Sequence, residues 1–283
     1  MIVITGASGK LGRQVIEKLL ETVPAAEIIA AVRNPEKAND LAALGIQVRQ
    51  ADYSKPETVR SALAGAEKVL LISSSEVGQR VPQHQAIIDA AKSAGAKLLV
   101  YTSILRAESS PLALASEHKA TEENIRASGL PFVFLRNGWY FENHTEQLGP
   151  AVQHGAILGA AGEGRFASAA RSDYAAAAAA VLTSPGHENK IYELAGDSSF
   201  TLSELAAVVS DQAGKPVSYH NSAQDYQDAL LSFGLPADFA AILVDADLGA
   251  AKGELNSSSS DLRTLIGRPS VTLPNAVKAA LEH

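Results

Sequence analysis

Three glycines near the N-terminus have the spacing of a phosphate-binding turn. The segment lies between an apolar run and a helical pattern, and its residues are Gly6, Ala7, Ser8, Gly9, Lys10, Leu11 and Gly12. In such a turn the first glycine permits the tight bend, the second lets the backbone approach a pyrophosphate, and the third lets helix and strand pack closely. The helix N-terminus adds free N–H groups and a favourable dipole. Because strand, turn and helix follow in this order, the segment predicts a dinucleotide site rather than an ordinary glycine turn.

The residues after the second apolar run indicate which dinucleotide binds. An NAD site usually has an acid there to bond the ribose 2′-hydroxyl, but this chain reads Val32-Arg33-Asn34-Pro35 with no acid before Glu36. Arg33 would attract a 2′-phosphate, and Lys10 could add a second positive contact. The alternative is that Arg33 is a solvated loop cation. The pattern favours NADP, with NADPH preferred over NADH.

Two further polar segments follow apolar runs of the same half. Asp52 could accept a hydrogen bond from the adenine amino group or cap the following segment, and the sequence leaves both readings open. Ser73, Ser74 and Ser75 are small and polar, so they would leave room for the nicotinamide ribose and donate hydrogen bonds to it. A plain serine loop is the alternative.

The first half of the chain alternates short apolar runs with helical patterns. We expect strands at Ile2–Thr5, Ile28–Val32, Val48–Gln50, Val69–Ile72, Leu98–Thr102 and Phe132–Arg136. The windows between them predict helices at Leu11–Glu21, Pro35–Leu44, Pro56–Leu63, Pro82–Ala94 and Ser116–Ala127. This alternation requires right-handed crossovers and a parallel sheet covered on both faces. The fold class predicted is therefore α/β, with a doubly wound parallel sheet.

The regular alternation of strand and helix patterns ends after about residue 137. Glycines between residues 155 and 164 indicate loops, and they are followed by an alanine-rich helix, Tyr174–Leu182, and a strand, Ile191–Leu194. Thr201 and Glu204 predict a capping box at the start of a helix, Leu202–Gln212, and the remainder is mostly helical. We expect a cofactor-binding domain at residues 1–140, with 165–185 added to it. Residues 141–283 would form a smaller α+β lobe that binds the substrate.

Composition excludes several classes of protein. The net charge of the 283 residues is 24 − 31 = −7, which is unfavourable for a broad nucleic-acid surface. The chain has no cysteine, so disulfides, thiol catalysis and Cys-based metal sites are excluded. No window approaches the roughly 20 apolar residues of a membrane span, and the N-terminus has no signal-peptide pattern. The histidines are scattered, and His84, His144 and His154 are interpreted most simply as loop or surface residues. We therefore expect no metal site, no nucleic-acid or membrane partner, and a cytoplasmic protein.

Several motifs together resemble a known family. The segments GASGKLG, AVRNPEKA, QADYSKPETV, LLISSSEVGQR and LRNGWYFEN are similar to those of the NmrA-like, atypical branch of the short-chain dehydrogenases. Within this branch the similarity is to the bacterial quinone and triphenylmethane reductases, and it extends over nearly the whole chain. It implies a Rossmann fold and a two-electron transfer from NADPH to a quinone.

The resemblance also implies a set of cofactor contacts. Besides residues 6–11, Arg33 and the three serines, they are Asn137, Gly138, Trp139, Tyr140, Phe141, Glu142 and Arg171. The position of Arg171 also suggests a cofactor contact independently of the resemblance, because it lies just before Asp173, where a cation could contact the pyrophosphate. The alternative is a surface arginine.

Ordinary short-chain dehydrogenases use a Tyr-x-x-x-Lys pair that this chain lacks. No tyrosine is followed by lysine four residues later, and the expected helix carries His118 and Glu122 instead. These two share a helix face. His118 is either a proton donor or half of a structural polar pair, and we favour the structural pair.

A quinone tolerates the loss of a dedicated acid, because it accepts hydride readily and the quinol anion spreads its charge over a ring. Positioning would then supply most of the catalysis. Tyr140 is the candidate ring contact and modest proton donor, whereas Trp139 or Phe141 could be ordinary core. The competing function is a non-catalytic NADP(H)-binding redox sensor of the NmrA type.

Overall fold

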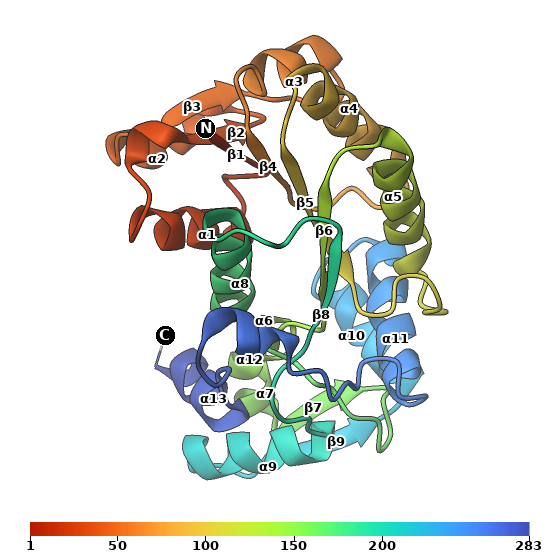
Figure 1. Ribbon diagram of the computed structural model, residues 1–283. Coiled ribbons are helices and arrows are strands. Elements are labelled where there is room, and N and C mark those ends of the chain that lie inside the picture. Colours follow the sequence, from red (N-terminus) through yellow and green to blue (C-terminus); the bar gives the residue numbers. More distant parts are fainter. Residues whose placement is uncertain (283) are drawn as a thin grey trace. The chain divides into compact units, whose positions relative to one another are not determined.

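The chain divides into two compact units (Figure 1). In the computed structural model, which describes residues 1–282, the first unit contains Met1–Glu108, Glu117–Asn137 and Tyr174–Glu193. The second contains Ser109–Ser116, Gly138–Asp173 and the chain from Leu194 onward. The assignment of a cofactor role and a substrate role to two domains stays a prediction.

A seven-stranded sheet forms the centre of the first unit. Its strand order is β3-β2-β1-β4-β5-β6-β8, and every pair from β3 to β6 is parallel. The strands are β1 Ile2–Thr5, β2 Ile28–Val32, β3 Gln47–Gln50, β4 Lys68–Leu71, β5 Leu98–Ile104, β6 Phe132–Asn137 and β8 Lys190–Leu194. This order and direction confirm the predicted doubly wound sheet.

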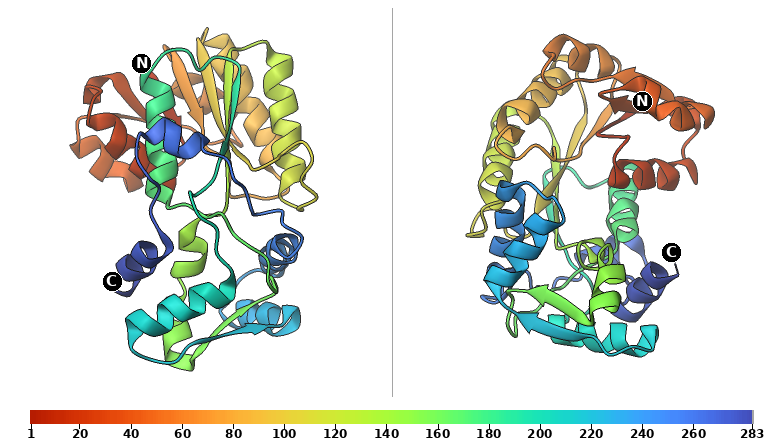
Figure 2. Two further views of the ribbon diagram at one scale, coloured as in Figure 1. Left: turned by 60° about the horizontal axis from the view of Figure 1, so that its bottom comes forward. Right: turned by 180° about the vertical axis from the view of Figure 1, so that it is seen from behind.

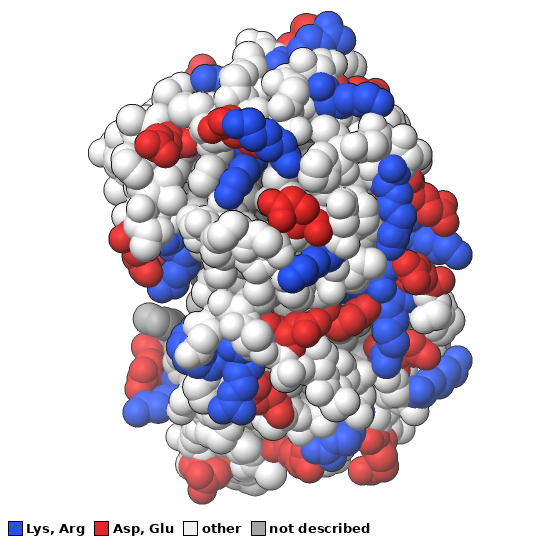
Figure 3. Space-filling model, in the orientation of Figure 1, with Lys and Arg blue, Asp and Glu red and all other residues white. Residues whose placement is uncertain are grey.

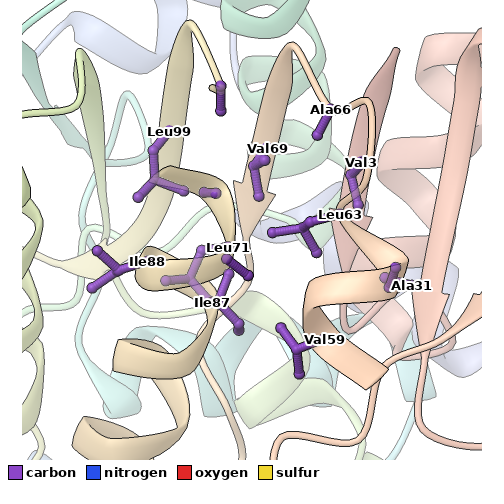
Figure 4. Packing of buried hydrophobic residues seen from close by; sticks show 14 of the residues in the cluster. Val3, Ala31, Val59, Leu63, Ala66, Val69, Leu71, Ile87, Ile88 and Leu99 are labelled. Atoms are coloured by element: carbon purple, nitrogen blue, oxygen red, sulfur yellow. The ribbon is translucent and has the colours of Figure 1, made fainter. Parts of the chain in front are cut away.

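Helices cover both faces of this sheet (Figure 1). They are α1 Lys10–Leu20, α2 Asn39–Ala43, α3 Pro56–Ala62, α4 Arg80–Ser93, α5 Ala115–Ser128 and α8 Arg171–Thr183, with 3₁₀ turns η1 Ala25–Glu27 and η2 Pro35–Ala38. Figure 4 shows one interface, where Val3, Val69 and Leu99 point from the strands toward Leu63 and Ile87 on the helical side. Val3 pairs with Val69 and Val69 with Leu99 on neighbouring strands, so the three side chains share one face of the sheet, and all five side chains are fully buried.

The second unit contains a small parallel pair of strands and several helices (Figure 2). The strands are β7 Ala156–Gly159 and β9 Ser218–Asn221. The helices are α6 Phe141–Thr145, α7 Leu148–His154, α9 Leu202–Ala213, α10 Ala223–Ser232, α11 Ala237–Ala250, α12 Asp261–Ile266 and α13 Leu273–Leu281. This composition agrees with the predicted α+β character of the C-terminal part.

Most predicted elements are present, and the predicted capping box of Thr201 and Glu204 is confirmed. Two predictions were wrong. Residues 156–159, expected to be loop, form β7, because they pair in parallel with residues 218–221 of β9. A Cβ at Gly159 would lie 2.6 Å from Leu202, which accounts for the glycine at this strand position. The expected helix Pro35–Leu44 is a 3₁₀ turn followed by a five-residue helix.

Charged side chains of both signs alternate over the face shown in Figure 3, as expected for a moderately acidic chain. Within residues 1–282, no helix is both long enough and apolar enough to cross a membrane.

Candidate functional site

The carboxyl ends of β1, β2 and β4 open onto a groove of about 470 Å³ in the first unit. This is the edge at which open α/β sheets bind ligands. The groove is lined by Gly6, Ser8, Gly9, Lys10, Leu11, Gly12, Ala31, Arg33, Asn34, Lys37, Ala51, Tyr53, Ile72, Ser73, Ser74 and Ser75. Ala7, also a predicted contact, does not line the groove, and its side chain is fully buried.

The glycine turn has the backbone shape that a pyrophosphate requires. Gly6 adopts φ +61°, in the left-handed region that favours glycine. Gly9 is the N-cap of α1, and its N–H donates to the Gly6 carbonyl at 3.0 Å. A Cβ at Gly12 would lie 2.6 Å from the Gly6 oxygen, so only glycine allows the helix to start this close to the strand. The turn therefore presents bare backbone and a helix N-terminus to the groove, which fits a dinucleotide.

The corner of the groove after β2 is basic but contains one competing acid. Arg33 is exposed, and Asn34 and Lys37 line the groove beside it. The Arg33 guanidinium forms an ion pair with Glu76, which follows the three serines. The Gln83 amide, and then Arg33, hold the pKa of Glu76 below its usual value, so this carboxylate stays ionised. A 2′-phosphate bound here would replace Glu76 as the partner of Arg33.

Two residues that follow β3 have different roles: Asp52 caps the next segment, and Tyr53 lines the groove. Asp52 accepts hydrogen bonds from the Ser54 amide at 3.0 Å and the Ser54 hydroxyl at 2.7 Å, which favours the capping reading over the adenine contact. Tyr53 lines the groove, although it was not predicted from the sequence as a site residue. Burial raises the pKa of Tyr53. The available signal was a tyrosine directly after the strand that ends at the ligand-binding edge.

A buried polar network holds the serine segment in place. The Ser73 amide donates to the Thr102 hydroxyl at 2.9 Å, and the Ser74 amide donates to His84 Nε2 at 3.0 Å. Arg80 Nε donates to the Ser74 carbonyl at 2.6 Å. The opposite ring nitrogen of His84 lies 2.9 Å from the Thr121 hydroxyl. Because both backbone groups of Ser74 are satisfied from behind, the segment is rigidly presented to the groove.

His118 belongs to this network and contacts Tyr101 and Arg80, so the structural polar pair with Glu122 that the shared helix face suggested does not form. His118 Nδ1 lies 2.7 Å from the Tyr101 hydroxyl, and Nε2 lies 3.3 Å from Arg80. Burial, with the charge of Arg80, lowers the pKa of His118 well below its usual value. The imidazole is therefore neutral near pH 7.

Glu122 pairs with another residue, the Arg136 guanidinium. It accepts hydrogen bonds from Arg136 Nε at 2.9 Å, from Arg136 Nη2 at 2.6 Å and from the Ser103 hydroxyl at 2.6 Å. This bidentate pair joins α5 to β6, and Arg136 also pairs with Glu193, at 2.9 Å, and with Glu108, at 3.1 Å. The sequence spacing placed His118 and Glu122 on one face but gave no information on these strand partners.

The segment that follows β6 is fixed by backbone hydrogen bonds within the second unit. The Phe141 amide donates to the Ala169 carbonyl at 3.0 Å, and the Ala169 amide donates to the Trp139 carbonyl at 3.2 Å. Phe141 is buried and stacks on Phe200, with ring centroids 5.6 Å apart, so it is core. Trp139 and Tyr140 are only partly buried.

Asn137 and Gly138 are both buried, Asn137 at the end of β6, and the Gly138 amide donates to the Leu194 carbonyl at 2.8 Å. Arg171 is the first residue of α8, and its amide donates to the Glu142 carboxylate at 2.9 Å. Its guanidinium lies 3.1 Å from Glu146. Glu142 and Arg171 therefore contact each other directly, and contacts of either with a dinucleotide stay a prediction.

Two histidines expected in loops or at the surface lie elsewhere. His84 is fully buried on α4, and His144 lies on α6 with its ring edge-on to Phe166 at 4.8 Å between centroids. Among residues 1–282 no group of three His, Asp or Glu side chains is arranged to hold a metal ion.

These histidines make stability depend on pH. Burial lowers the pKa of His84 to about 3, with help from Arg80, and that of His144 to about 4. Below about pH 6.5 the unfolded chain binds protons at these rings that the folded chain does not, so the free energy of unfolding falls as the pH drops. We expect His144→Phe to remove about 1–2 kcal/mol of the fall between about pH 7 and pH 5, measured by urea unfolding.

His154→Gln is the matched control, since His154 is exposed, and it should leave the pH dependence unchanged. An unaltered pH dependence in His144→Phe would contradict the assignment of this ring as a buried neutral imidazole.

Comparison with known proteins agrees with the geometry of the groove. A family model described as NAD(P)H-binding matches residues 6–185. This chain belongs to the NAD(P)H-binding, NmrA-like family. Quinone oxidoreductase 2 of Escherichia coli (strain K12) is 56% identical over 278 residues, covering 98% of this chain and 97% of that protein.

Two solved structures of the family are also similar. The NADPH-dependent quinone oxidoreductase of Escherichia coli complexed with NADPH has a TM-score of 0.96 at 55% identity, covering 99% of this chain and 100% of that one. The Citrobacter sp. triphenylmethane reductase complexed with NADP(H) has a TM-score of 0.95 at 41% identity, with the same two coverages. The family resemblance noted from the sequence is confirmed.

Proposed function

We propose that this protein is an NADPH-dependent oxidoreductase that reduces quinones, or similar flat electrophiles, by two electrons. The observation that carries the proposal is the groove, in which a bare glycine turn and a basic corner lie at the carboxyl edge of the sheet. The 56% identity to a quinone oxidoreductase over nearly the whole chain supports the same activity. When bound, NADPH supplies a hydride, which with one proton converts a quinone to its quinol.

Different residues of the groove would bind different parts of NADPH. The glycine turn and the N-terminus of α1 would face the pyrophosphate. Arg33 and Lys37 offer charge to the 2′-phosphate. Ser73 to Ser75 offer small polar side chains for the nicotinamide ribose, on a segment that Arg80 and His84 hold rigid.

The substrate ring would lie against the segment Asn137–Phe141. Tyr140 is partly exposed and combines a ring face with a hydroxyl, so it can orient a flat acceptor and donate a hydrogen bond to a quinone oxygen. Phe141, which stacks on Phe200, supports this segment from the core side. Because a quinone accepts hydride readily, orientation is the main contribution required of these side chains.

Variants at Tyr140 separate orientation from proton donation. If stacking dominates, Tyr140→Phe should keep nearly full activity, whereas Tyr140→Ala should lose mainly kcat/KM for quinone with little change in NADPH affinity. Steady-state kinetics at saturating NADPH, with calorimetric NADPH titration as the control, measure both quantities. An equal fall of kcat in both variants would make the hydroxyl the acid, and unchanged quinone kinetics in both would mean that the substrate binds elsewhere.

His118 contributes through structure in this proposal. Its neutral ring satisfies the buried Tyr101 hydroxyl and lies against Arg80. We expect His118→Ala to lower quinone turnover by less than about tenfold, below the 10²–10⁴-fold share of general acid–base catalysis. A loss beyond a hundredfold with NADPH binding intact would instead make His118 the proton donor.

The alternative, a non-catalytic redox sensor, uses the same groove. The near full-length identity to an oxidoreductase favours the enzyme. Mixing the protein with NADPH and a simple benzoquinone separates the two, because a sensor binds NADPH without oxidising it. The cytoplasmic location stays a prediction.

A further inference from the structure

A second cavity lies entirely within the C-terminal unit. Its volume of about 310 Å³ is in the range of small-molecule sites, roughly 300–1,000 Å³. Helices α6, α7, α9, α10 and α11 and strand β7 contribute to its walls. The apolar part of the wall includes Leu148, Ile157, Leu158, Leu202, Leu205 and Leu230. Neither Tyr140 nor any residue of the glycine turn lines it, so the cavity is separate from the proposed NADPH and quinone contacts.

One carboxylate stands in this apolar wall without a positive partner. Asp247, on α11, is 5% exposed, and its Oδ2 accepts a hydrogen bond from the Ala160 amide at 2.8 Å. Among residues 1–282, no Lys, Arg or His forms an ion pair with it. A buried carboxylate with a single hydrogen bond and no countercharge is costly, and a titratable group of this kind in the wall of a cavity is a candidate ligand contact.

The other titratable groups in the wall do not supply the missing charge. His144 lines the cavity, and its Nε2 is buried without a hydrogen-bond partner among the described residues. Burial lowers the pKa of this ring to about 4, so it is neutral near pH 7. Tyr226 lines the wall close enough to Asp247 that the carboxylate helps burial to raise the pKa of the Tyr226 phenol. Burial raises the pKa of Asp247 to about 6, which leaves it ionised near pH 7.

We propose that this cavity binds a small amine carried on an apolar body, with the protonated nitrogen against Asp247. The ammonium group supplies the countercharge that the wall lacks, and its further N–H groups can serve acceptors such as the His144 ring. The face of the Tyr226 ring suits a cation as well. A neutral hydroxyl would satisfy one hydrogen bond and leave the charge uncompensated, and an anion would be repelled. The apolar walls take the hydrocarbon part of the ligand.

A matched series of probes tests the charge preference. We would titrate the full chain, saturated with NADP⁺ near pH 7, with 1-naphthylmethylamine, 1-naphthalenemethanol and 1-naphthoate in a calorimeter. The amine should bind at least about tenfold more tightly than the alcohol, since a charge-assisted hydrogen bond contributes about 1.5–3 kcal/mol, and the carboxylate should not bind. An amine that fails to bind, or binds no better than the alcohol, overturns the proposal.

Three variants test the location. Ala229→Trp, on α10, fills the cavity and should abolish amine binding, whereas Leu231→Trp adds the same side chain at an exposed position outside it and should not. Asp247→Asn retains an acceptor for Ala160 and should remove the advantage of the amine over the alcohol. Tyr140→Ala should leave amine binding intact. Loss of binding in Tyr140→Ala, or retention in Ala229→Trp, would place the amine elsewhere and contradict the proposal whatever the fate of the quinone reductase activity.

Discussion

Gly9→Val should abolish binding of both NADPH and NADH without unfolding the protein. Even a Cβ at this position would lie 3.2 Å from the Gly6 carbonyl oxygen, and the branched side chain would occupy the groove where the pyrophosphate meets backbone. If the displaced pyrophosphate lost as few as about two charge-assisted hydrogen bonds, at about 1.5–3 kcal/mol each, binding would weaken by more than about a hundredfold. Calorimetric titration measures the affinities, and circular dichroism reports the fold.

Gly149→Val is the matched control, because a side chain added there meets nothing within 4 Å. It should bind both cofactors as the unaltered protein does. If Gly9→Val kept its affinity for NADPH, the dinucleotide would have to bind outside this groove.

Substitutions of Arg33 and Glu76 should shift the preference between NADPH and NADH in opposite directions. Arg33→Ala removes the cation offered to the 2′-phosphate and leaves the Glu76 carboxylate facing that phosphate, so NADPH affinity should fall by about tenfold or more. NADH lacks the phosphate, and its affinity should change little. Glu76→Gln removes the competing partner of Arg33 and a negative charge, so NADPH affinity should rise while NADH affinity stays unchanged.

The two affinities are measured by titration of each variant with each cofactor. Gln50→Ala is a suitable control, since its amide touches only the Arg33 carbonyl, at 3.5 Å. Equal losses for NADPH and NADH in Arg33→Ala would refute the assignment of the 2′-phosphate to this corner.

Local patterns were sufficient to predict the sheet and the glycine turn. The central strands β1, β2, β4 and β5 are almost entirely buried, so they appear in the sequence as largely apolar runs, and β1 and β2 have the predicted bounds. The turn was recognisable because its glycines are required by backbone geometry, as the φ of Gly6 and the tight approach at Gly12 show.

What the sequence could not predict depends on partners distant along the chain. Glu76 forms an ion pair with Arg33, which lies 43 residues earlier in the chain. His84 accepts a hydrogen bond from the Ser74 amide, and hydrophobic periodicity does not predict the conformation of the serine segment. The strand β7 was missed because four residues ending in glycine carry no alternation, and the strand is formed by pairing with β9, about 60 residues later in the chain. Spacing on a helix face similarly could not show that His118 contacts Tyr101 instead of Glu122.

The most direct test of the proposed activity follows the absorbance of NADPH after the protein is mixed with NADPH and a simple benzoquinone. We expect one NADPH to be consumed for each quinone reduced, at a rate proportional to protein concentration, and Gly9→Val to stop the reaction. Tight NADPH binding with no oxidation beyond the rate without protein would contradict the enzyme and indicate a dinucleotide sensor.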